Sequence, residues 1–148
     1  MNKRLSNFCA LLLIIATVIV AVYRIIFSSE EIILHWDFTG NITSYGNRFA
    51  LIILPIIAFI LYLILNNYKS HPYDLLLPSR KKVIKNDFNQ KKLIKYIDNI
   101  NPLISLLVFY VTMCSARYIP LKAWFLYVVV IGIIVYFTIV WHSLIRKH

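Results

Sequence analysis

The sequence predicts an all-α membrane protein with four transmembrane helices, a short extracytoplasmic loop or hairpin and a cytoplasmic amphipathic helix. Hydrophobic residues make up 60% of the 148 residues and charged residues only 15%, and the mean hydropathy is +0.73. The apolar residues are concentrated in four runs, with nearly all charges between them. Because so much contiguous apolar surface needs lipid, a water-soluble enzyme is not expected.

The first apolar run, residues 8–27, follows Lys3 and Arg4 and is long enough to span a bilayer. About 20 consecutive apolar residues match a hydrocarbon core that is roughly 30 Å thick. A cleaved signal peptide is the alternative, but the run is longer than the hydrophobic region of such a peptide, and no clear small-x-small cleavage site follows it. We therefore expect an uncleaved signal-anchor helix.

The second and third runs each contain a proline that bears on helix geometry. Residues 49–65 include Pro55, which a membrane helix tolerates when a local kink or a neighbouring group satisfies the freed carbonyl, so a bend is expected there. Residues 102–118 follow Asn101, a favourable N-cap, and Pro102 suits the first helical position. The third helix is therefore expected to begin at Pro102.

The fourth run, residues 123–145, has a tryptophan near each end. Trp124 and Trp141 are 17 residues apart, roughly 25 Å along a helix, which places one indole at each membrane interface. Only residues 117–122 separate this run from the third, so the two helices are expected to form a tight antiparallel pair. Residues 1–148 are therefore expected to form a single membrane domain.

The distribution of lysine and arginine predicts the orientation. The termini and residues 66–101 hold twelve basic and three acidic residues, whereas the rest of the chain, including residues 28–48, holds four basic and three acidic ones. Because basic residues are retained on the cytoplasmic side, both termini and residues 66–101 are expected in the cytoplasm, with residues 28–48 outside. The net charge is +10. Because the basic residues flank apolar runs and line no soluble groove, no nucleic-acid partner is expected.

Residues 66–101 contain an amphipathic stretch. Leu93, Tyr96, Ile97 and Ile100 follow the i, i+3, i+4, i+7 spacing of one helix face. The basic residues of this segment that we expect to face lipid are Lys81, Lys82, Lys85, Lys91, Lys92 and Lys95. Each lysine near an anionic leaflet gains about 1 kcal/mol, so a helix lying on the inner leaflet, with anionic lipid as its partner, is expected. A docking site for a cytosolic protein is the alternative.

The segment between the first two runs, residues 28–48, is predicted to form a short hairpin or compact loop. β-forming residues lie on both sides of a Thr-Gly-Asn turn. Gly40 and Gly46 are expected to supply positive φ angles. The Asp37 carboxylate is expected to hold a local turn.

The most motif-like residues of the chain are His35-Trp36-Asp37-x-x-Gly40, then Tyr45-Gly46-Asn47, and Leu54-Pro55 in the second run. They resemble the bacterial membrane domain of unknown function that opens the immunity proteins against the sporulation-delaying toxin. Two positions depart from that family's pattern, since Ile33 stands where proline is usual and Asn47 where lysine is frequent. The resemblance covers residues 8–65. It implies a multi-spanning protein of the bacterial plasma membrane with a role in toxin immunity or signal reception.

The leading hypothesis is a non-enzymatic protein whose external loop recognises a peptide, a lipid or a partner protein. The candidate binding residues are His35, Trp36, Asp37, Gly40, Tyr45, Gly46 and Asn47. Glu31, His35 and Asp37 could form a metal or acid–base site. A structural role in which His35 and Asp37 hydrogen-bond the loop is favoured, because no spacing here demonstrates a pocket. No catalytic residue, metal or cofactor is assigned.

Two other hypotheses remain open. A membrane enzyme acting on a lipid or peptide at the outer interface would use His35 and Asp37 as its polar centre. A structural subunit of a larger membrane complex would co-purify with a stable partner. The sequence does not predict the oligomeric state.

Charged residues are scarce within the four runs. Arg24 lies near the end of the first run and is expected to extend towards Glu30 or Glu31. The runs contain no aspartate, glutamate or lysine. Coupled ion transport is therefore not expected, because it normally needs such residues within the membrane.

Overall fold

The computed structural model describes residues 3–76 and 85–145. Its principal elements are α1 (Lys3–Phe27), β1 (Ile32–Trp36), β2 (Ile42–Gly46), α2 (Ile53–Ser70), α3 (Asp87–Ser115) and α4 (Ala123–Ile145). Two short 3₁₀ segments, η1 (Arg48–Ile52) and η2 (Pro72–Leu76), flank α2. All four α-helical segments are long and apolar enough to cross a membrane. This confirms the prediction of four helices that are long and apolar enough to span a membrane.

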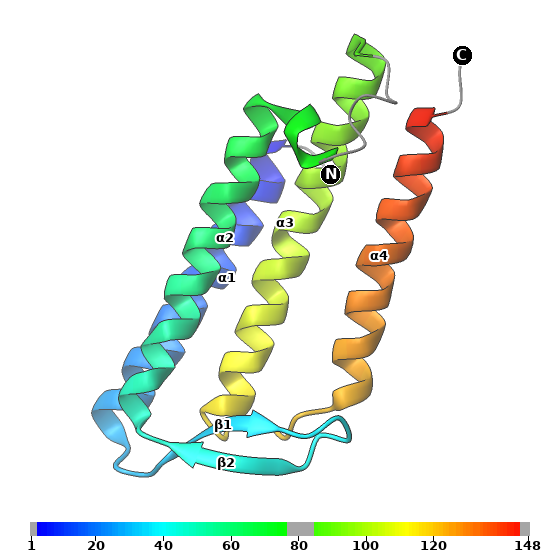
Figure 1. The fold of residues 1–148 in the computed structure, drawn as a ribbon. Helices are drawn as coiled ribbons and strands as arrows, with labels where there is room; N and C mark the ends of the chain where they lie inside the picture. Colours follow the sequence, from blue (N-terminus) through cyan, green and yellow to red (C-terminus); the bar gives the residue numbers. More distant parts are fainter. Residues whose placement is uncertain (1–2, 77–84, 146–148) are drawn as a thin grey trace.

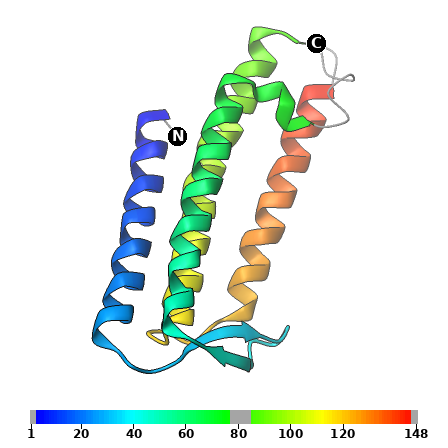
Figure 2. The same ribbon diagram turned by 60° about the vertical axis from the view of Figure 1, so that its left-hand side comes forward.

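The helices run alternately in opposite directions (Figures 1 and 2). α1 begins and α4 ends at one end of the bundle, which we call the terminal end; the β-hairpin lies across the other, the hairpin end. α3 contacts all three other helices. On α4, the side chains of Val128, Ile131 and Ile139 are 58–62% exposed. In a bilayer such apolar side chains contact lipid.

Small residues allow α1 to pack closely on α3. Ser6, Ala10, Thr17 and Ala21 are fully buried and recur at intervals of four or seven residues, which places them on one face of α1. Small side chains let two helix backbones approach each other, which favours helix association in lipid, where the hydrophobic effect contributes little. α1 and α3 form the most extensive interhelical contact of the bundle.

α3 begins well before the predicted position. It is one helix of 29 residues, about 43 Å long, and its N-cap is Asn86. The Asn86 side chain accepts a hydrogen bond from the backbone N–H of Asn89 at 2.8 Å. The predicted start at Pro102, with Asn101 as the N-cap, is therefore wrong.

The apolar stripe of the predicted amphipathic helix packs inside the bundle. Its residues are Leu93, Tyr96, Ile97 and Ile100, each at most 6% exposed. They pack against Leu65 and Tyr68 of α2, and against Phe137, Val140 and Leu144 of α4. The prediction of a separate helix lying on the membrane surface is wrong, because a stripe that faces helices has the same spacing as one that faces lipid.

Pro102 lies inside α3 and leaves the carbonyl of Asp98, four residues earlier, without its helical donor. The hydroxyl of Ser6, on α1, donates a hydrogen bond to this carbonyl at 2.5 Å. The proline is accommodated because a neighbouring helix supplies the missing hydrogen bond, as a membrane interior requires.

Pro55 lies in the first turn of α2, where the missing N–H removes no hydrogen bond from the helix interior. The chain reaches α2 through η1, a short 3₁₀ segment. The chain thus changes from a 3₁₀ helix to an α-helix just before Pro55.

α3 and α4 are joined by a short turn that begins with a Schellman motif. The N–H of Arg117 donates to the Cys114 carbonyl at 3.0 Å, and that of Tyr118 to the Met113 carbonyl at 3.1 Å. Arg117 has a φ of 64°, the left-handed conformation that glycine usually supplies at this position. The turn leads directly into α4 at Ala123, as the short connection predicted.

Candidate functional site

The hairpin is fixed to the bundle by an apolar contact and lies across its end (Figure 2). β1 and β2 pair antiparallel, with two irregularities in register. Ile32 of β1 is 2% exposed and packs with Ala21, Leu51 and Ala116 from three parts of the bundle. The hairpin is therefore a part of the folded bundle and not a loose connection.

The tip of the hairpin is held against the start of α4. The Tyr127 hydroxyl donates a hydrogen bond to the Phe38 carbonyl at 2.6 Å. Gly40 has a φ of +91°, and a Cβ added there would lie 3.4 Å from the Leu121 carbonyl oxygen. The prediction of a positive φ at Gly40 is confirmed, and the close approach of the connecting turn adds a second reason for glycine.

Gly46 is favoured by a side-chain contact and not by backbone conformation. Its φ is not in the positive range, so the prediction of a positive φ is wrong. A Cβ at this position would lie 2.7 Å from Leu34 Cγ and closer still to Cδ1. The side chain of Leu34, which is 49% exposed, thus lies where this Cβ would be and would have to move to admit any residue other than glycine.

Asp37 organises the turn of the hairpin. Its Oδ1 atom accepts hydrogen bonds from the Thr39 backbone N–H at 2.9 Å, the Thr39 hydroxyl at 2.7 Å and the Asn41 N–H at 2.8 Å. Its Oδ2 atom accepts one from the Asn41 side-chain amide at 3.1 Å. The carboxylate is thus surrounded by donors from its own turn.

These donors, first the Thr39 hydroxyl and then the Asn41 N–H, lower the pKa of Asp37 from 3.8 to about 2. Because the folded pKa lies below the unfolded one, the stabilisation by this carboxylate is fully present above pH about 4 and is lost as the pH falls through about 2. We expect an NMR titration of the Asp37 carboxyl to show a midpoint near 2. Thr39→Ala should raise it, and Thr43→Ala should leave it unchanged. A midpoint near 4 in the unmodified protein would contradict this arrangement.

The other candidate residues also take part in hairpin geometry. His35 Nδ1 and the Thr43 hydroxyl are hydrogen-bonded across the strands at 2.6 Å. The Asn47 side chain accepts a hydrogen bond from the Phe49 N–H at 3.0 Å and caps η1. The Tyr45 ring lies 5.8 Å from the Arg117 guanidinium, and Trp36 is half-buried.

Acid–base or metal chemistry finds little support in this arrangement. Within residues 3–76 and 85–145, no three His, Cys, Asp or Glu side chains are grouped as metal ligands would be. Asp37 stays ionised near neutral pH and accepts hydrogen bonds within its own turn, which makes it a poor general acid. The structure does not bring Glu31, His35 and Asp37 together as one centre.

A charge cluster lies at the hairpin end of the bundle. Arg24 of α1 donates to Glu30 at 3.0 Å, which confirms the expectation that Arg24 extends towards Glu30, and Arg117 lies 3.6 Å from the same carboxylate. The hydrogen bond from Arg24, and then the charges of Arg117 and Arg24, lower the pKa of Glu30. The cluster joins the end of α1 to the end of α3.

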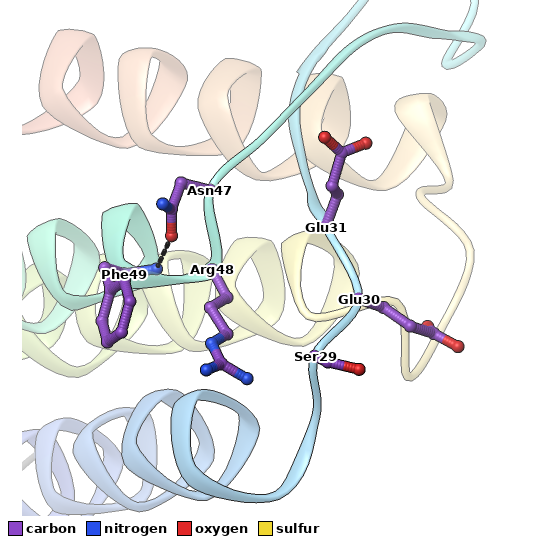
Figure 3. Close-up of a pocket in the computed structure, with 6 residues that line it drawn as sticks. All are labelled: Ser29, Glu30, Glu31, Asn47, Arg48 and Phe49. Atoms are coloured by element: carbon purple, nitrogen blue, oxygen red, sulfur yellow. Dashed lines mark hydrogen bonds between the residues drawn. The ribbon is translucent and has the colours of Figure 1, made fainter.

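A polar pocket of about 350 Å³ lies beside this cluster, between the two segments that lead into and out of the hairpin (Figure 3). Its lining residues are Ser29, Glu30, Glu31, Asn47, Arg48 and Phe49. Arg48 extends from the start of η1 towards the segment that carries Ser29 (Figure 3), and it donates a hydrogen bond to the Ser28 carbonyl. Of these residues, only Asn47 was predicted from the sequence as a binding residue, and Glu31 only as part of a possible metal or acid–base site.

Sequence reasoning also missed a buried ion pair at the terminal end. Lys69 Nζ lies 2.8 Å from Asp98 Oδ1, and the two side chains are 5% and 6% exposed. Lys69 also donates to the Asn7 side chain at 2.6 Å. Asn101, one turn further along α3, is 1% exposed, and its side-chain amide has no hydrogen-bond partner in the described part of the chain. The available signal was Asp98 itself, the only acidic residue in residues 88–101.

The basic residues of the predicted lipid-facing segment are only partly placed. Lys81 and Lys82 lie outside the described residues. Lys85 is exposed, and its ammonium lies 5.9 Å from the Tyr73 ring. Lys91 and Lys95 are exposed on α3, and the Lys92 ammonium lies 4.3 Å from the Phe88 ring.

A comparison with protein families bears on the hairpin directly. Residues 12–59 match a domain of unknown function, DUF1648. The DUF1648 match runs from α1 through the whole hairpin into α2. No curated protein and no solved structure matches the chain. The chain thus has four helices that could span a membrane, and the region that matches DUF1648 includes the candidate site.

Proposed function

We propose that this protein is non-enzymatic and that its hairpin recognises a peptide or a partner protein outside the cytoplasm. By its resemblance to the membrane domain of toxin-immunity proteins, the role of this recognition is toxin immunity or signal reception. The observation that carries the proposal is a hairpin that is fixed to the bundle but leaves large apolar side chains exposed.

The exposed apolar side chains of the hairpin are Leu34, Phe38, Ile42 and Tyr45, which are 43–89% exposed. Phe38 is the most exposed of them, at 89%. Apolar and aromatic side chains that a folded protein leaves in solvent are typical of binding surfaces. Because the hairpin is held at both its base and its tip, little conformational entropy would be lost on binding.

The outer strand of the hairpin also offers backbone hydrogen bonds. β1 contacts α3, whereas β2 lies on the side of β1 that faces away from the helices (Figure 1). The free edge of a strand can pair with an extended peptide, which then adds a strand to the sheet. A peptide with alternating apolar residues suits this edge and the neighbouring exposed side chains.

The proposed orientation places the hairpin outside the cell and the exposed lysines of α3 at the cytoplasmic leaflet, where they would meet anionic lipid. The uneven distribution of basic residues supports it. Asp37→Cys and Lys91→Cys, both at exposed positions, provide the test. A thiol reagent that does not cross membranes should label only the first in whole cells, and labelling of the second alone would contradict the proposal.

The recognition itself can be tested with a photo-crosslinking amino acid at position 38 or position 42 in whole cells. We expect one discrete polypeptide adduct from both positions. The same amino acid at position 139, which lies on the lipid-facing side of α4, serves as the control and should give none. Adducts that are identical at all three positions, or absent from the two hairpin positions, would contradict the proposal.

A further inference from the structure

A second pocket, entirely apolar in its lining, lies between α1 and α2. It has a volume of about 280 Å³ and is lined by Ile14 and Val18 of α1 and by Ile52, Ile56 and Ile60, among others, from the η1 and α2 segment. Ile14 is 5% exposed, whereas Ile56 is 53% exposed. The pocket is therefore an open groove on the lipid-facing side of the bundle.

The groove and the polar pocket at the hairpin end share one segment of chain. Phe49 lines the polar pocket and Ile52 lines the groove, which are three residues, or about 6 Å, apart along a 3₁₀ helix. From Ile52 to Ile60 the groove extends for about 12 Å along the helix axis. One leaflet contributes about 15 Å to a hydrocarbon core of roughly 30 Å. A polar site at the membrane surface thus continues into an apolar site at the depth of one leaflet.

The polar pocket contains charges of both signs. One N–H of Arg48 donates to the Ser28 carbonyl and fixes the guanidinium beside the pocket, and a guanidinium has further donors that suit a phosphate. Glu30 and Glu31 line the same pocket, and because Glu30 is already paired with Arg24 and Arg117, Glu31 is the carboxylate that can attract a ligand. The Glu31 carboxylate would repel a headgroup that is only anionic and attract one that also carries an ammonium.

We propose that this composite site binds one zwitterionic phospholipid of the leaflet on the hairpin side. Arg48 binds the phosphate, Glu31 attracts the ammonium, and one acyl chain occupies the groove between α1 and α2. A lipid of the phosphatidylethanolamine type has this chemistry. This inference does not depend on peptide recognition by the hairpin, because the exposed hairpin side chains do not line either pocket.

Native mass spectrometry of the protein in mild detergent, with phosphatidylethanolamine added, provides the test. We expect one retained lipid per chain, and a weaker affinity for phosphatidylglycerol with the same acyl chains. Arg48→Gln should reduce the affinity about tenfold. Ile56→Trp, which fills the groove at an exposed position, should reduce it similarly. The matched control variants are Lys122→Gln and Ile139→Trp, which lie outside both pockets and should bind the lipid as the unmodified protein does.

Two further measurements test whether the site recognises the whole headgroup or phosphate alone. Glu31→Gln should reduce the preference for phosphatidylethanolamine over phosphatidylglycerol without unfolding the protein, because Glu31 is exposed. Inorganic phosphate should not displace the retained lipid. Equal retention of both lipids by the unmodified protein would overturn the proposal. So would equal losses in the control variants, or a change of oligomeric state in Ile56→Trp with lipid retention unaffected.

Discussion

Asp98→Leu is expected to lower the free energy of unfolding by about 3–5 kcal/mol, the largest effect of any single substitution considered for this bundle. The variant leaves the Lys69 ammonium, whose side chain is 5% exposed, without a counter-charge. Asn7 still accepts a hydrogen bond from Lys69, but a neutral amide does not replace the carboxylate. Unfolding in mixed micelles, followed by circular dichroism, measures the change.

The double variant Lys69→Met/Asp98→Leu separates a lost ion pair from a lost side chain. Because removal of both charges also removes the cost of burying them, it should recover most of the stability lost in Asp98→Leu. Asp87→Leu is the control, since Asp87 is exposed in the first turn of α3, and it should change stability by less than about 1 kcal/mol. A double variant no more stable than Asp98→Leu would contradict the role of the pair.

Gly46→Ala is expected to destabilise the hairpin by about 1 kcal/mol, the cost of a side chain forced out of its preferred rotamer. The new methyl group would lie 2.7 Å from Leu34 Cγ, so Leu34 or the strand must move. The effect is local to the hairpin, and hydrogen exchange of the amides in β1 and β2 measures it better than global unfolding.

A second substitution should reverse the effect of Gly46→Ala, and another glycine provides a control. Leu34→Ala removes the obstructing atoms, so Gly46→Ala/Leu34→Ala should regain most of the lost protection. In α4, nothing lies within 4 Å of a Cβ added at Gly132, and Gly132→Ala should be neutral or stabilising by up to about 1 kcal/mol. Unchanged hairpin protection in Gly46→Ala alone would show that Leu34 does not constrain this site.

The four spans could be predicted from the sequence because their signal is local. The length of an apolar run can be read from the sequence without knowledge of its neighbours in the fold. The fourth run was predicted with the same bounds as α4. The start of α3 could not be predicted in this way. Its apolar stripe fits a leaflet or a helix bundle equally well, and only the positions of α2 and α4 decide between them.

The candidate site could be predicted in part for the same reason. The turn residues Asp37 and Gly40 act through neighbours close in sequence, so their roles were accessible. The contact of Gly46 with Leu34 depends on strand register, and the pocket beside Arg48 depends on two segments that meet only in the fold. Lys69 and Asp98 were both expected in the cytoplasmic segment, and their pairing could not be predicted because 29 residues separate them in the sequence.

The hydrogen bond that Ser6 donates across to α3 has a consequence for biogenesis. Until α1 has docked, α3 carries an unsatisfied carbonyl near Pro102, and such a group costs several kcal/mol in hydrocarbon. α1, which leaves the ribosome before α3, thus holds the donor that the later helix needs. Expression of the remaining helices without α1 should therefore yield a poorly assembled protein, and supplying α1 as a separate peptide should restore it.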